Sequence, residues 1–220
     1  IKIEGTRTTD INGAVFNVYN DTCIVTAGYM QTTRGRSEAF ASFSVVFLTV
    51  GWTVAAFATS RILNRRNEED VILLGSILMI PSVLLAGISV SFTYVLAILF
   101  GAYFLVGASI GFISTSGLTL LQSSSTPEEM GRTTSAHQFL RTVAITYGVA
   151  IGGSILLAVV KARTGDVESV RKVLSGDNVT VGAETTEAIG SGLAWAHVFS
   201  VGTACIGLLV AISLYRKRKV

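Results

Sequence analysis

Apolar residues run in long blocks along this chain, separated by short polar stretches. Three blocks, at 71–87, 94–121 and 142–160, contain no Asp, Glu, Lys or Arg. A helix needs about 20 residues to cross roughly 30 Å of hydrocarbon, and each block reaches or approaches that length. Because the core of a bilayer offers no water to unpaired backbone groups, spans of this kind are helical. The pattern therefore predicts an all-α membrane protein.

Six spans can be drawn between the polar stretches, and they form one predicted domain over residues 1–220. The connections are short except for a long outer loop at 161–192. Pro81 lies inside the third span and predicts a kink there. The predicted spans are 11–29, 40–60, 71–90, 92–121, 139–160 and 193–214.

Basic residues predict the orientation, because Lys and Arg gather on the cytoplasmic side of membrane proteins. With the N-terminus inside, eleven basic residues, including Arg141, fall on the inner side and six on the outer side. Four of those six belong to the long loop, where charge has less influence on topology. We therefore expect a multi-pass protein of the cell (inner) membrane with both termini in the cytoplasm.

Composition agrees with a membrane class and excludes several others. Half of the residues are hydrophobic (50%), 14% are charged and the mean hydropathy is +0.60, whereas soluble domains carry about 25% charged residues. The net charge of +3 does not indicate a nucleic-acid partner, since the basic residues lie at span ends rather than in a stripe with aromatics. Cys23 and Cys205 fall inside spans and are interpreted as apolar core residues. We expect no metal and no cofactor.

One stretch carries a first family resemblance. The segment 51–57 begins Gly51-Trp52 and is followed by the polar turn 61–70. It resembles the weaker second copy of the major facilitator signature loop, in which a glycine-bearing helix face precedes an acidic-Arg turn. Asn64 stands at the position of the acid, and Arg65 keeps the arginine.

A second stretch is more specific, and it consists of 117–122, 127–136, 138–141 and 148–152. These segments are similar to the penultimate cytoplasmic loop and the following helix of drug:proton antiporters with fourteen spans. The loop is expected at 122–138 and the helix near Ser135, with Glu128 and Glu129 just before it. Arg141 would then lie about one turn inside, able to snorkel or to pair with the other half of the transporter.

The resemblance covers roughly 10–215, as the C-terminal six-helix half of such a transporter. It implies a secondary active transporter, not an enzyme, that exports hydrophobic or cationic small molecules, including drugs, in exchange for protons. An exporter of sugars, lipids or metabolites in the same superfamily is the alternative. The implied partners are the lipid bilayer, a small-molecule substrate and an N-terminal half on the same or a separate chain.

Polar residues inside spans are the candidates for chemistry. Asp21 is the acid well inside a predicted span, where an ionised carboxylate is costly unless it is paired, hydrated or functional. Asn17 and Asn20 lie one turn behind it on a similar face, and a structural Asp21 held by a neighbouring helix is the alternative. The candidates for transport or proton coupling are Asp21, Asn17, Asn20 and Arg141. The aromatic candidates for a substrate cavity, or for packing against helices and lipid, are Trp52, Tyr103, Phe104 and Tyr147. The small-xxx-small pairs expected at helix contacts are Gly107 with Gly111 and Gly148 with Gly152.

Two histidines complete the candidates. His137 is expected at the membrane boundary beside Gln138, and His197 at the interface beside Trp195. Ser116 and His197 also raise the remote alternative of a rhomboid-like intramembrane serine protease. The glycine-serine and Ala-His patterns of that class are incomplete here, and no oxyanion-stabilising His and Asn occur in the span 40–60.

Overall fold

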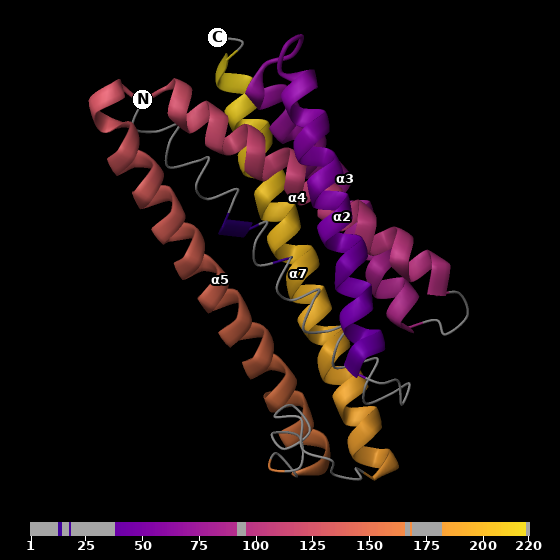
Figure 1. Ribbon diagram of the computed structural model, residues 1–220. Coiled ribbons are helices and arrows are strands. Elements are labelled where there is room, and N and C mark those ends of the chain that lie inside the picture. The colour runs from indigo at the N-terminus through magenta and orange to yellow at the C-terminus, as the bar shows by residue number, and fades with distance from the viewer. Residues whose placement is uncertain are drawn as a thin grey trace.

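The computed structural model describes residues 13, 14, 18, 38–91, 96–165, 168 and 182–218. These ranges contain five long α-helices (Figure 1), namely α2 (Glu38–Ile62), α3 (Glu68–Ser91), α4 (Leu96–Ser123), α5 (Pro127–Thr164) and α7 (Ala183–Arg218). All five are long and apolar enough to cross a membrane. The protein is therefore a multi-pass, all-helical membrane protein. The predicted span 11–29 lies outside the described residues except for Gly13, Ala14 and Val18, so five helices are seen rather than the six expected.

Two helices begin earlier than predicted: α5 starts at Pro127 rather than near Ser135, and α7 at Ala183 rather than 193. The charges and Gly131 in 122–138 pointed to a loop, but proline suits the first turn of a helix and acidic residues suit its N-terminus. Glu128 and Glu129 thus lie within the first turn of α5. Arg141 consequently lies about four turns, or roughly 21 Å, from Pro127 rather than one turn inside.

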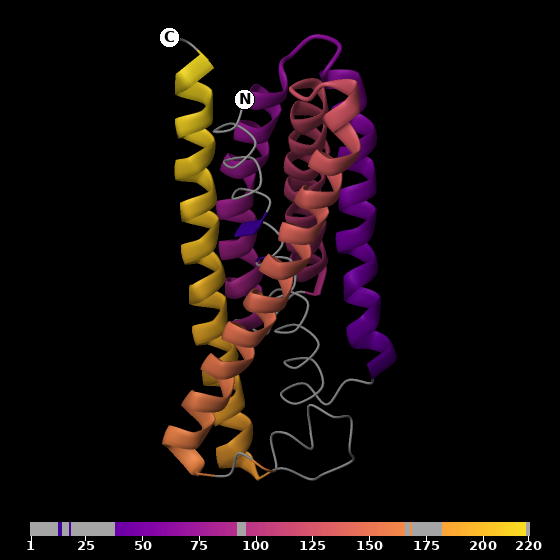
Figure 2. The ribbon, with the colours of Figure 1, turned by 90° about the vertical axis from the view of Figure 1, so that its left-hand side faces the viewer.

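Successive helices run in opposite directions, which gathers the connections at two ends of the bundle. The turn between α2 and α3, the turn between α4 and α5, and the C-terminal end of α7 share one end (Figures 1 and 2). We call this the basic end, because the described arginines there are Arg61, Arg65, Arg66, Arg132, Arg216 and Arg218. At the opposite end, α5 carries Lys161 and Arg163 in its last turn. That the basic end faces the cytoplasm stays a prediction from the sequence.

The core is organised around α4, which packs between α2 and α3 and is the most buried of the five helices. The helix α7 packs against both α3 and α5, whereas α5 touches α4 only slightly. Val106, Ile110 and Ile113 of α4 lie fully buried in the main apolar cluster. The described part therefore consists of a tight α2–α4–α3 group extended through α7 to α5.

Glycines bring α2 and α4 unusually close together. A Cβ atom at Gly107 would collide with the carbonyl oxygen of Leu48, and one at Gly51 would collide with that of Phe104. A Cβ at Gly111 would lie 2.6 Å from the carbonyl oxygen of Trp52. Glycine permits such backbone-to-backbone contact in membranes, where dispersion forces replace the hydrophobic effect between helices. We call Gly51, Gly107 and Gly111 the glycine seam.

Many hydroxyl groups inside the helices donate to the backbone of their own helix. Thr59 donates to the carbonyl oxygen of Ala55 at 2.8 Å, Ser76 to that of Ile72 at 2.9 Å, and Ser109 to that of Leu105 at 2.9 Å. Each bond reaches back four residues along the same helix, so the hydroxyl needs no partner from lipid or from another helix. Polar residues are thereby accommodated in spans that face hydrocarbon.

Large apolar side chains also cover the outside of the bundle, at helical spacing. Examples are Phe43, Val50, Val54 and Phe57 on α2, and Ile77, Leu84 and Ile88 on α3. Exposed apolar surface on this scale marks contact with lipid or protein rather than water. These faces are consistent with the bilayer as the surroundings of the protein.

The helices α5 and α7 extend past the others at the end opposite the basic end (Figures 1 and 2). With 38 and 36 residues they are about 57 Å and 54 Å long, well beyond the roughly 30 Å of hydrocarbon. Gly165, with a φ of 70°, ends α5 in the left-handed conformation that glycine adopts most readily. The pair stays in contact there, since a Cβ at Gly192 would lie 2.6 Å from Cδ1 of Leu156.

The glycine seam predicts a strong difference between two glycines of α4. Gly107→Ala should lower the stability of the purified protein by about 1–3 kcal/mol, because the added methyl group meets the backbone of α2. Gly101→Ala is the matched control, since a Cβ at Gly101 would have no atom within 4 Å and alanine is the better helix former. Thermal unfolding in detergent, followed by size-exclusion of the folded fraction, measures both. Equal melting temperatures for the two variants would contradict the close approach.

Candidate functional site

The candidate site lies where α5 reaches across to α2. Cζ of the Arg141 guanidinium lies 5.7 Å from the centroid of the Trp52 ring, within the range of a cation–π interaction. Trp52 is about ten residues, or roughly 15 Å, from the end of α2 at Ile62 and so lies near the middle of the span. Its backbone is held by the glycine seam, and its half-buried side chain packs against the main core. Two residues from the sequence predictions, Trp52 and Arg141, are therefore in contact.

Arg141 has an exceptional position among the charges. It is the one Asp, Glu, Lys or Arg in the five described helices that lies more than two turns from both helix ends. A charge at such depth in a bilayer is costly and marks a functional position by default. The Trp52 ring offsets part of that cost by offering its electron-rich face.

Two further polar side chains belong to the same stretch of α5. Nη1 of Arg141 donates to Oε1 of Gln138 at 3.3 Å, one turn back along the helix. His137 is 4% exposed and lies ten residues after the start of α5 at Pro127, so it is buried within the helix; its place at the membrane boundary stays a prediction. Gln138 was not among the predicted site residues. The sequence feature that could have identified Gln138 is its i,i+3 spacing to Arg141 in a stretch that is otherwise mostly apolar.

The other aromatic candidates lie in different environments. Tyr103 is buried in the main core cluster, and Phe104 is half-buried with its carbonyl oxygen against Gly51. Tyr147 is 65% exposed on α5. Trp52 differs from Tyr147 in that it contacts a charged group, Arg141, near the middle of its helix.

The remaining candidates divide between described and undescribed residues. Asp21, Asn17 and Asn20 lie outside the described residues, so their roles stay predictions. Asn64 and Arg65 are exposed in the turn between α2 and α3 at the basic end. The buried glycines of α5 include the predicted pair, Gly148 and Gly152. Within the described ranges, no three His, Cys, Asp or Glu residues gather as metal ligands.

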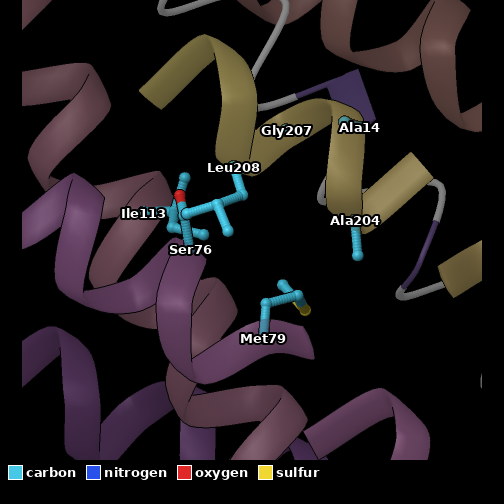
Figure 3. A pocket seen from close by; sticks show the side chains of 7 residues that line it. All are labelled: Ala14, Ser76, Met79, Ile113, Ala204, Gly207 and Leu208. Atoms are coloured by element: carbon cyan, nitrogen blue, oxygen red, sulfur yellow. The ribbon is translucent and has the colours of Figure 1, made fainter. Parts of the chain in front are cut away.

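A small pocket lies apart from Trp52 and Arg141, between α3, α4 and α7 (Figure 3). Its lining is almost wholly apolar, and Ser76 already donates its hydroxyl to its own helix. The space admits a water-sized group, far less than the clefts that hold small-molecule ligands. We interpret it as a packing gap. It is lined by Ala14, Ser76, Met79, Ile113, Ala204, Gly207 and Leu208.

His197 joins α7 to α3 and is buried between them rather than placed at the membrane interface. Its Nε2 donates to the carbonyl oxygen of Val83 at 2.7 Å. Gly87 provides the space, since a Cβ there would lie 2.7 Å from Nε2. Nδ1 of His197 is buried without a hydrogen-bond partner, and so is the hydroxyl of Ser116. The two residues are thus not hydrogen-bonded, and the serine–histidine pair that a rhomboid-like protease needs is not formed.

Comparison with known proteins gives information on the fold. No protein-family model and no curated protein sequence matches the chain. A solved structure does match, that of a bacterial homolog of the human lysosomal transporter Spinster in an inward-facing and occupied conformation, with a TM-score of 0.64 and 15% sequence identity. The match covers 96% of this chain and 49% of the transporter. The chain therefore has a fold of the major facilitator type, and it spans about half the length of that transporter.

The His197 contact predicts coupling between two substitutions. Gly87→Ala alone should lower the melting temperature markedly, because the new methyl group meets the imidazole ring. In a His197→Ala background the ring is absent, so adding Gly87→Ala should have little further effect. A double-mutant cycle on melting temperatures measures this coupling. Additive effects of the two substitutions would show that His197 does not occupy the space beside Gly87.

Proposed function

We propose that this chain is one half of a secondary active transporter that exports hydrophobic or cationic small molecules in exchange for protons. The observation that carries the proposal is the guanidinium of Arg141 over the ring of Trp52 at mid-depth of the helices. Major facilitator transporters bind substrates near the bilayer midplane, between two halves. The shared fold and the sequence resemblance of 117–152 to drug:proton antiporters support the same function.

The proposal includes a second half, on the same or a separate chain. One half supplies one wall of a central cavity, and alternating access needs the opposing wall. Two observations support this: the chain spans about half of the matching transporter, and α5 has exposed apolar residues on either side of Arg141, namely Phe139, Leu140 and Tyr147. A six-helix bundle, with 11–29 as its first helix, would complete this half.

Proton coupling is assigned to Asp21, supported by Asn17, Asn20 and Arg141. Asp21 is the acid that the sequence places well inside a predicted span, and Arg141 is the charge that lies farthest from the ends of the described helices. An acid in low dielectric favours its neutral form, and the amides of Asn17 and Asn20 can hydrogen-bond either form. Such a group can take a proton from one side of the membrane and release it to the other.

The orientation is tested by labelling intact cells with a membrane-impermeant maleimide. In a background with Cys23 and Cys205 replaced by alanine, Ala183→Cys should react from outside, because it begins α7 at the end opposite the basic end, which the proposed orientation places outside. Ser124→Cys, between α4 and α5 at the basic end, should react only after the cells are opened. Reaction of Ser124→Cys in intact cells would reverse the orientation.

The function is tested by export from cells or vesicles in which this half is assembled with its N-terminal half. Export of a cationic dye, per folded transporter and as a function of pH, should lose its proton dependence in Asp21→Asn. The matched control is Asp10→Asn, which changes an acid just before the predicted span. Identical pH profiles for wild type and Asp21→Asn would remove Asp21 from proton coupling, and no proton-dependent export in wild type would overturn the proposed function.

A further inference from the structure

Arg141 covers the same ring surface that a cationic substrate would use. We propose that Arg141 is a built-in competitor of cationic substrates at Trp52, so that binding of a substrate cation displaces the guanidinium from the indole ring. This inference rests on the proposed function and specifies how the site would discriminate between substrates.

The ring of Trp52 is the fixed partner in this contact. Gly111 allows α4 to approach so closely that a Cβ atom added there would lie 2.6 Å from the carbonyl oxygen of Trp52. The side chain of Trp52 also packs against the main core. Indole is the strongest cation-binding ring among the amino acids. A rigidly held indole at mid-depth is therefore a preformed site for a cation, and in this structure the guanidinium of Arg141 lies over it.

Arg141 is the partner that can move. Its guanidinium is carried on a flexible stem from α5, a helix that touches α4 only slightly. The hydrogen bond from Nη1 to Oε1 of Gln138, at 3.3 Å, lies within α5 itself. Arg141 can leave the ring while it keeps this bond, because Gln138 belongs to the same helix. Displacement would thus remove the α2–α5 contact without removing the contact inside α5.

Competition also follows from charge. A substrate cation on Trp52 would lie within several ångströms of the Arg141 charge, and like charges repel strongly in the low effective dielectric of a membrane protein. Removing the Arg141 charge should therefore strengthen the binding of cations. For an anionic ligand we expect the reverse. Arg141 would attract the anion, so removing the Arg141 charge should lower its affinity.

The test uses tetraphenylphosphonium and tetraphenylborate, which have nearly the same shape and opposite charge. The full chain is placed in lipid nanodiscs with Trp195→Phe, which leaves Trp52 as the single tryptophan, since the sequence has two. Fluorescence of Trp52 then reports binding of each ion, with empty nanodiscs as the partition control. The variants are Arg141→Met, which keeps length without charge, Arg141→Lys, and Arg132→Met as a control at the exposed start of the same helix.

We expect Arg141→Met to bind tetraphenylphosphonium about tenfold more tightly, a change typical of one close charge pair at moderate dielectric. Tetraphenylborate should bind more weakly to it, Arg141→Lys should stay near wild type, and Arg132→Met should match wild type. Unchanged or weaker binding of tetraphenylphosphonium to Arg141→Met would overturn the inference, as would the absence of any response of Trp52 to that ion. This binding measurement needs no proton gradient. Its result therefore stands whether or not proton-dependent export is found.

Discussion

The close approach of α2 and α4 is the constraint on which the other features depend. Gly51, Gly107 and Gly111 let the two backbones touch, which fixes the depth and direction of Trp52. In lipid, helices gain little from hiding apolar surface, so the fit of small residues replaces the hydrophobic effect as the specific attraction. With α2 fixed on one side of α4 and α3 on the other, α7 and α5 are added through α3. The candidate site arises where the loosely attached α5 meets the firmly held α2.

Much of the fold was predictable from the sequence, because the bilayer imposes a simple rule on span length and polarity. Four long apolar runs gave helices close to α2, α3, α4 and the membrane part of α7. The helix starts at Pro127 and Ala183 were missed, since hydropathy detects the part of a helix that lies in lipid and not its extension into water. The additional turns of α5 are polar, and their helical state depends on N-terminal proline and acids rather than on apolar periodicity.

The site was only partly predictable, and the reason is geometric. Arg141 and Trp52 were both candidates, but they are far apart in the chain, and their contact depends on how α5 crosses α2. The early start of α5 also placed Arg141 about 21 Å along the helix rather than one turn from its start. His197 was expected at the interface because Trp195 is close to it in sequence, yet two positions along a helix turn the side chain by about 200°, to the face that meets α3 at Gly87. Sequence reveals which residues are unusual in lipid, whereas packing decides what each one touches.

The length of α5 gives the Arg141 contact a mechanical consequence. From Arg141 to Thr164 the helix runs for about 35 Å, and it stays paired with α7 at its far end. A rigid rod of that length acts as a lever, so a tilt of α5 by about 10° at the Trp52 contact would shift its far end by roughly 6 Å. A small event at this contact would thus be amplified at the end opposite the basic end, where α5 and α7 project beyond the other helices (Figure 2).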